Sequence, residues 1–315
     1  MMRMTVLASG SKGNSTVISS SRTRVLVDAG LSCRELLKRM AMAGEDPTAL
    51  NAILITHEHQ DHVAGLSVLA RRLKIPVFFT EPTHRAWVRM LTPRTTMSYA
   101  KWLEQVQREK EARASVAMHS IDLQAEADDE ELCDSDVEAD VAKKPDPTRL
   151  PAVEYFHSGT QFSIGDIDIT PFTIPHDATD PCGFVFEAEG VRMAVATDLG
   201  YMPPNVKAAL RRVDVMLLES NHDLEMLKDG PYPWSVKQRV LSRVGHLSNH
   251  ATAEFLEKDY DGGATWIVLG HLSESNNAPE LARLSAEQAL ESRPTLLGNR
   301  VLLAHQAVPL EPITV

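Results

Sequence analysis

The densest group of metal-binding residue types in this 315-residue chain lies in the seven-residue segment from Thr56 to His62. It holds His57, His59, Asp61 and His62, and imidazole and carboxylate suit borderline divalent cations such as zinc. The segment follows a short apolar stretch, so we expect it where a strand ends and a helix begins. Side chains two residues apart on a strand end point the same way, and the following turn directs later side chains elsewhere. The spacing therefore predicts two adjacent metal centres.

Strand-like and helix-like segments alternate along most of the chain, which is typical of an α/β protein. The expected strands are 4–8, 15–19, 23–28, 52–56, 76–80, 213–218, 265–269 and 300–304, with hairpin-like pairs at 161–173 and 183–197. The expected helices are 33–43, 62–73, 205–212, 233–244 and 250–258.

Two parts of the chain resemble each other. The segment 25–30 is similar to 194–200, since each is an apolar strand that leads through Asp to Gly. The strand that ends at His57 is similar to the strand that ends at His271. Two similar halves, each a sheet covered by helices, predict a four-layered α/β sandwich.

The negative charge of the chain is concentrated in one segment. The formal net charge is -11, and residues 122–140 hold ten acids and no Lys or Arg. Without this segment the chain is nearly neutral, so the overall charge does not exclude a nucleic-acid partner. The strand and helix pattern fails between about 104 and 150, where acids at this density offer little apolar surface to bury. We therefore expect a single domain over 1–315 with a disordered acidic insertion, and favour an inert insertion over a regulatory tail.

The composition, with 43% hydrophobic and 24% charged residues, is typical of a soluble globular protein. No apolar stretch is long enough to span a membrane, and the first residues lack the pattern of a signal peptide. We expect a cytoplasmic protein with no membrane partner. The three cysteines are far apart in the sequence, which argues against a disulfide framework and against CxxC-type metal or redox chemistry.

The four metal-binding residues in the segment 56–62 match the HxHxDH motif, and over most of its length the chain resembles the metallo-β-lactamase superfamily. The resemblance implies an αβ/βα sandwich with a metal site in the cleft between the sheet edges. It implies that His176 is a further histidine ligand, that Asp198 bridges two metals, and that His271 is the last ligand. The implied cofactors are two divalent ions, Zn or Mn. One would be held by His57, His59 and His176, and the other by Asp61, His62 and His271.

Within the superfamily the chain is more similar to the YycJ/WalJ group, which resembles 5′-to-3′ DNA exonucleases, with the RNase Z and phosphodiesterase groups as the nearest relatives. The matching segments are 7–15, 176–178, 197–200, 219–223, 245–249 and 270–277. This similarity implies a phosphodiesterase or nuclease that uses a dinuclear metal site, with DNA favoured over RNA as the substrate. The acidic insertion departs from the pattern of the group.

Two residues are candidates for proton transfer. Asp61 would lie beside the attacking water and could orient it or accept its proton. His246 resembles the proton-donating histidine of the RNase Z relatives, and His250, at the start of an expected helix, competes with it for this role.

Five further residues are candidates for substrate binding. Ser11, Lys12 and Asn14 lie in a Gly- and Ser-rich loop whose backbone N–H groups could hold a phosphate, although a plain tight turn explains the loop equally well. Asn276 and Asn277 could bond sugar or phosphate, or cap the helix expected at 279–289.

The alternatives to a nuclease are a small-molecule phosphodiesterase and a thioester hydrolase on the same site. A non-enzymatic metal-binding signalling or nucleic-acid-binding module is a further alternative, but such a protein would typically have lost a ligand. A bridging carboxylate makes the two-metal site symmetrical, which favours phosphodiester over lactam hydrolysis.

Overall fold

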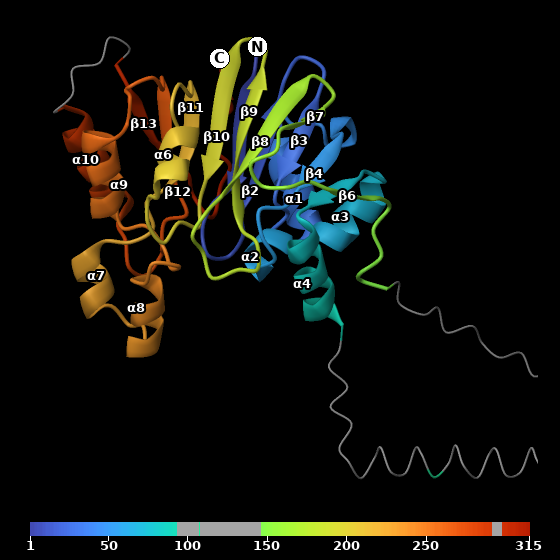
Figure 1. Ribbon diagram of the computed structural model, residues 1–315, viewed down its shortest axis with the longest axis horizontal. Helices are drawn as coiled ribbons and strands as arrows, with labels where there is room; N and C mark the ends of the chain where they lie inside the picture. The colour runs from blue at the N-terminus through green and yellow to red at the C-terminus, as the bar shows by residue number, and fades with distance from the viewer. Residues whose placement is uncertain (93–106, 108–145, 292–297) are drawn as a thin grey trace, which may run out of the picture. The chain divides into compact units, whose positions relative to one another are not determined.

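The computed structural model describes residues 1–92, 107, 146–291 and 298–315. The helices and strands given below belong to one compact unit of residues 1–91 and 147–315 (Figure 1). Most of the insertion expected at about 104–150, including the acidic segment 122–140, lies outside the described residues.

The first sheet has seven strands in the order β14-β1-β2-β3-β4-β5-β6. They are β1 (Arg3–Ala8), β2 (Ser15–Ser19), β3 (Arg24–Val27), β4 (Ala52–Leu54), β5 (Val77–Phe79), β6 (Val153–Tyr155) and β14 (Ile313–Thr314). Strands β3 to β6 are parallel to one another, so the carboxyl ends of β3 and β4 meet at the same edge of the sheet. The segment with the HxHxDH motif follows β4 at this edge.

The second sheet also has seven strands, in the order β13-β12-β11-β10-β9-β8-β7. They are β7 (Phe162–Ile164), β8 (Ile167–Thr173), β9 (Cys182–Ala188), β10 (Val191–Ala196), β11 (Val215–Glu219), β12 (Trp266–Gly270) and β13 (Arg300–Leu303). Strands β10 to β13 are parallel, so the chain leaves β10, β11 and β12 at one edge. Each of these three strands delivers a polar residue that the site uses.

Alternation along the strands explains how the two sheets pack. Val25 and Val27 face the second sheet in a central core, whereas Leu26 faces the helices outside the first sheet. In β11, Leu217 joins the central core, whereas Met216 packs against the helices outside the second sheet. Both faces of each sheet are therefore buried, which explains why these strands are almost continuously apolar.

Helices cover the outer face of each sheet. The first sheet is covered by α1 (Cys33–Met42), α3 (Leu66–Leu73) and α4 (Glu81–Leu91), and the second by α6 (Pro204–Ala209), α9 (Asn249–Lys258) and α10 (Pro279–Glu291). The order helix, sheet, sheet, helix confirms the predicted four-layered α/β sandwich. Among the described helices, none combines the length and the apolar character that crossing a bilayer would need.

The helix expected at 62–73 is in fact two helices, α2 (Gln60–Val63) and α3. The chain turns between them at Gly65, whose N–H bonds to Ala29 O at 2.8 Å. A Cβ atom at this position would lie 2.1 Å from Leu31 O, so only glycine fits here. The turn lets α2 present the end of the metal-binding motif to the cleft.

Four elements were not expected from the sequence. They are α4, β6, α7 (Leu224–Asp229) and the 3₁₀ helix η1 (Pro47–Ala49). The helix expected at 233–244 is limited to α8 (Trp234–Val240). In Figure 1, α2, α7 and α8 all lie at the end of the sandwich away from the two chain termini.

Candidate metal centre

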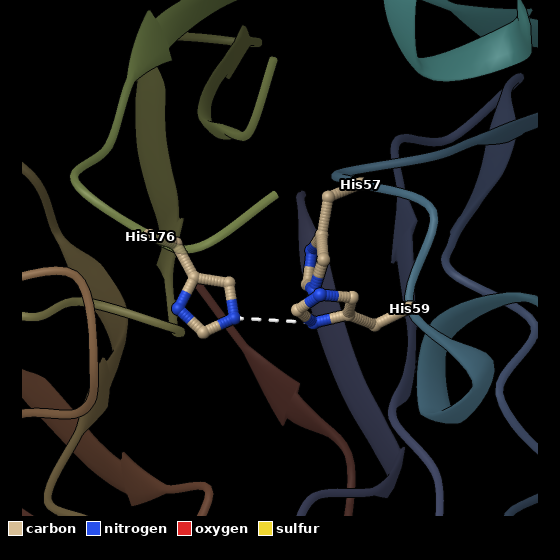
Figure 2. Close-up of side chains that lie close together, drawn as sticks. All are labelled: His57, His59 and His176. Atoms are coloured by element: carbon tan, nitrogen blue, oxygen red, sulfur yellow. Dashed lines mark hydrogen bonds between the residues drawn. The ribbon is translucent and has the colours of Figure 1, made fainter. Parts of the chain in front are cut away.

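Three histidines from distant parts of the sequence face one another at the edge of the sheets (Figure 2). His57 and His59 come from the loop after β4, and His176 comes from the loop after β8. His176 Nε2 lies 3.3 Å from His59 Nδ1, and one nitrogen from each ring lies within 4.8 Å of the others. Burial lowers the pKa of His57 well below its usual value, which keeps this ring neutral and able to bind a cation.

A second cluster lies beside the first and contains Asp61, His62 and His271. His62 Nε2 is 3.5 Å from Asp61 Oδ2, and His271 Nε2 is 3.8 Å from the same oxygen. Asp61 and His62 lie in α2, and His271 directly follows β12. The cluster therefore joins an element of the first sheet's half to a strand end of the second sheet.

Asp198, which follows β10, lies between the two clusters. Its Oδ1 is 3.8 Å from His176 Nε2, and its Oδ2 is 3.4 Å from His62 Nε2. The side chain is almost fully buried, yet Oδ2 accepts no hydrogen bond. His57 Nε2 is likewise buried without a hydrogen-bond partner.

The two unpaired atoms, His57 Nε2 and Asp198 Oδ2, indicate whether divalent cations fit the site. A buried polar atom without a partner costs about 1–3 kcal/mol. An ion bound by neutral imidazole nitrogens and carboxylate oxygens would satisfy His57 Nε2 and Asp198 Oδ2, and this donor set suits zinc or manganese. The residues present therefore fit divalent metal binding.

Buried acceptors fix the orientation of the histidine rings. His62 Nδ1 lies 2.8 Å from Asp28 Oδ2, and Asp28 also accepts hydrogen bonds from the backbone and hydroxyl of Thr56. His176 Nδ1 donates to Gly245 O at 3.1 Å. The carboxylate and the carbonyl oxygen can only accept, so Nδ1 donates in each case and Nε2 faces the cluster.

Glu219, the last residue of β11, is fully buried and holds two histidines at once. Its Oε1 lies 2.8 Å from His246 Nδ1 and 3.0 Å from His271 Nδ1. Its Oε2 accepts the backbone N–H groups of Leu199 and Leu247. Burial alone would raise the pKa of Glu219, but the two imidazoles outweigh it and lower the pKa to about 2. Glu219 is therefore ionised and positions both rings.

The sequence analysis gave Glu219 no role of its own. One sequence feature could have indicated this role: Glu219 is an acid at the end of the apolar run Val215–Glu219. An acid in such a buried position usually has hydrogen-bond or charge partners. The two partners come from residues 27 and 52 positions later, so this role is visible only in the fold.

His246 and His250, the two candidates for proton donation, lie in different surroundings. His246 lines the cavity that contains Asp61, Asp198 and His271, and its side chain is 20% exposed. His250 is exposed in the first turn of α9 and is not part of the cavity lining.

The three candidate substrate residues of the Gly- and Ser-rich loop have different surroundings. Ser11 lines the cavity, whereas the exposed Lys12 pairs with Glu274 at 2.5 Å. Asn14 is buried, and its Nδ2 lies 3.2 Å from Asp61 Oδ2 and 3.0 Å from His62 Nε2. Asn14 thus contacts the metal-binding motif itself.

Asn276 and Asn277 are buried rather than exposed to the cavity. Asn277 Nδ2 donates to the carbonyl oxygens of Ser220 and Asn221. The backbone N–H of Asn276 donates to Ser273 Oγ at 3.2 Å. Both residues thus hold neighbouring loops in place.

Two loops of the first half support the site by close contact with it. Ser9 Oγ accepts the backbone N–H of His271 at 2.7 Å, which ties a ligand of the second half to the first sheet. Gly30 packs against the motif so closely that a Cβ atom there would lie 1.7 Å from Asp61 O. The glycine is therefore required for the approach of the two loops.

The cavity over the clusters has a volume of about 250 Å³. One wall consists of residues in and just before α8, which the sequence analysis did not single out as functional. They are Tyr232, Val236, Arg239 and Val240.

Comparison with known proteins gives consistent results. A family model described as the metallo-beta-lactamase superfamily matches residues 8–271. The exodeoxyribonuclease WalJ of Streptococcus pneumoniae is 33% identical over 283 residues, which cover 90% of this chain and 86% of the relative. The exodeoxyribonuclease YycJ of Bacillus anthracis is 31% identical over 292 residues, covering 93% and 90% of the two chains.

Among solved structures, the metallo-beta-lactamase fold protein YhfI from Bacillus subtilis is similar with a TM-score of 0.61 and 13% sequence identity. The match covers 98% of each chain. At this identity the likeness concerns the fold alone.

Proposed function

This chain belongs to the metallo-beta-lactamase superfamily, and we propose that it is a divalent-metal-dependent hydrolase that cleaves phosphodiester bonds of DNA from a 5′ end. The observation that carries the proposal is the convergence of seven metal-binding side chains at one place in the fold. Five of them line the same cavity as His246, and the other two, His57 and His62, are buried directly behind it. Two relatives that cover about nine-tenths of this chain are named exodeoxyribonucleases.

We assign the metal ligands as two sets that share Asp198. His57, His59 and His176 would hold one ion, and Asp61, His62 and His271 the other. When bound, such cations lower the pKa of a water molecule and neutralise charge that develops on a phosphoryl group. The unpaired buried atoms of His57 and Asp198 support this assignment.

The protein's own residues supply the proton transfers. Asp61 Oδ2 lies at the edge of the cavity, where it can orient the attacking water or accept its proton. His246 also lines the cavity, and Glu219 accepts a hydrogen bond from its Nδ1. His246 Nε2 is then the atom that gives a proton to the departing sugar oxygen. This placement favours His246 over His250.

We further propose that the protein acts in the cytoplasm as one domain carrying an acidic insertion, and that DNA rather than RNA is its substrate. A thioester has a leaving group that departs without protonation. The buried Glu219–His246 pair would therefore have no task in a thioester hydrolase, which favours a substrate with an alkoxide leaving group.

The test is digestion of 5′- and 3′-labelled single- and double-stranded DNA and RNA, with bis-p-nitrophenyl phosphate and a thioester as comparison substrates. Asp61→Ala is expected to reduce DNA cleavage by about 100-fold or more. Asp168→Ala, an exposed acid in β8, is the matched control and is expected to behave like the wild type. Turnover of the thioester alone would refute the nuclease proposal. Full metal occupancy with no turnover of any substrate would favour a binding module.

A further inference from the structure

A surface beside the cavity combines basic residues with exposed apolar side chains. Residues 230–253 contain no Asp or Glu but include Lys237, Arg239 and Arg243, in a chain with a net charge of -11. Within this range, Trp234 is 67% exposed, and Leu241 and Val244 are 51% and 44% exposed. We call the surface formed by residues 231–244 the α8 platform.

The α8 platform is continuous with the candidate active site. Tyr232, Val236 and Arg239 line the same cavity as Asp61 and His246. The backbone N–H of His246 donates to Val240 O, the last residue of α8, at 3.0 Å. A ligand bound to α8 therefore lies next to His246, which we assign as the proton donor.

The backbone that carries the aromatic residues of the platform is held in place before any ligand binds. Pro231 and Pro233 flank Tyr232 and fix their own backbone φ angles, and Pro233 caps the N-terminus of α8. Lys237 is buried and its Nζ donates to Lys228 O at 2.7 Å, which ties α8 to α7. Figure 1 shows these two helices side by side at the end of the sandwich. A backbone that is already ordered loses little conformational entropy on binding.

The cations of the platform have positions suited to a phosphate backbone. Arg239 forms an ion pair with Asp177 and its side chain is still 59% exposed. The Arg243 guanidinium lies 4.3 Å from the centre of the Tyr201 ring, which holds it at the surface. Exposed aromatic rings next to cations are the usual means of binding single-stranded nucleic acid, because bases stack on the rings while phosphates meet the cations.

We propose that the α8 platform binds the unpaired bases of a single DNA strand, with a base stacked on Trp234, and thereby directs a single-stranded end into the cavity. This inference rests on the proposed nuclease function and adds a substrate preference to it. In a duplex the base faces are covered by neighbouring pairs and are not available to the indole.

The experiment compares full-length wild type, Trp234→Ala and Trp234→Phe on a single-stranded oligonucleotide. Trp234→Ala is expected to raise KM by about tenfold, within the range of roughly 5- to 150-fold for loss of one stacked base, with little change in kcat. Trp234→Phe keeps a stacking face and is expected to restore most of the affinity. Leu284→Ala, which removes another exposed apolar side chain in α10, is the matched control.

A second substrate separates stacking from a structural effect. On an oligonucleotide of the same length with abasic sugars in place of bases, wild type and Trp234→Ala are expected to have the same KM. An equal rise in KM on both substrates, or no rise on either, would overturn the proposal. Wild type that hydrolyses bis-p-nitrophenyl phosphate but no DNA would instead refute the nuclease function itself.

The other possible occupant of this apolar surface is a second copy of the chain. Sedimentation of wild type and Trp234→Ala distinguishes the two. A wild-type dimer that becomes monomeric in Trp234→Ala, with an unchanged KM for DNA, would assign the surface to self-association and overturn the proposal.

Discussion

Replacing Glu219 with Gln tests the proton-transfer role most directly, because the side chain keeps its shape and loses its charge. One carboxylate oxygen serves two imidazoles, and the other serves two backbone N–H groups. Glutamine has a single acceptor oxygen, so one of these pairs must face an NH₂ group instead. Two donors then lose their acceptor at about 1–3 kcal/mol each, a total of about 2–6 kcal/mol.

The kinetic effect of Glu219→Gln should depend on the leaving group. General acid catalysis contributes about 100- to 10,000-fold, so DNA cleavage is expected to fall by at least about 100-fold. Hydrolysis of bis-p-nitrophenyl phosphate is expected to fall much less, because p-nitrophenolate departs without a proton. Both rates are measured at saturating metal, so that weaker binding through His271 does not contribute.

The lost acceptors destabilise the protein, so a second variant keeps this prediction testable. His246→Asn removes the proton donor and leaves Glu219 with His271. It should give the same separation of the two substrates, and the double variant should be no slower than about the slower single variant, because the two residues act as a unit. Equal losses on DNA and on the p-nitrophenyl ester in both variants would refute the reasoning.

Three further predictions concern Asp28 and Gly30, which support the site, and His222, a buried histidine after β11 whose ring nitrogens accept and donate no hydrogen bond within the described residues. Asp28→Asn keeps the shape of the side chain, and Asn tolerates the left-handed backbone at this position, but the bond to His62 Nδ1 becomes weaker. Metal affinity measured by titration should therefore fall about 10- to 100-fold. An unchanged affinity would contradict the role of Asp28. Gly30→Ala places a Cβ against Asp61 O, so we expect lower metal content and about 1–3 kcal/mol lower stability by urea unfolding. Gly44→Ala meets open space but strains the backbone at a φ of +70°, so it should lose some stability and still retain its metal. Burial lowers the pKa of His222 to about 4, so the unfolded chain binds the proton more readily and His222 destabilises the fold as the pH falls from about 6.5 to 4. His222→Gln should therefore lose less stability than the wild type between pH 7 and pH 4.5, by up to about 1.4 kcal/mol per pH unit, and equal losses would show that His222 does not carry this effect.

The layers of the fold were predictable because apolar runs and turn signals follow the strands closely. Segments such as 15–19, with every residue buried, match the expected strand at both ends. The helix 62–73 was wrong at Gly65, because its break is caused by contact with Leu31, a residue more than thirty positions earlier. Local sequence patterns do not contain such contacts.

The supporting network of the site was harder to predict than the metal-binding motif. The motif is dense in sequence, whereas Glu219 acts through residues from two other loops. Asn14 has the composition of a phosphate-binding loop residue, but its amide is used to hold Asp61 and His62. A polar residue in a Gly-rich loop has the same appearance in sequence whether it faces a ligand or the protein.

Backbone strain at the site was also absent from the sequence patterns. Asp28, Asp198 and His271 all adopt left-handed φ angles of 61°, 63° and 54°. Each follows a strand of a parallel pair. Asp198 and His271 line the cavity, and Asp28 bonds to His62 behind it. Non-glycine residues in this conformation cost about 1–2 kcal/mol each, which the surrounding sheets must offset.

The division of the ligands between the two halves has a consequence for the chain as a whole. His57, His59, Asp61 and His62 come from the first half, and His176, Asp198 and His271 from the second. A polypeptide cut between Leu91 and Pro147 would leave each fragment with an incomplete coordination sphere. Metal uptake would then measure fragment complementation directly, since each of the two ligand sets is complete only where the two fragments have reassembled.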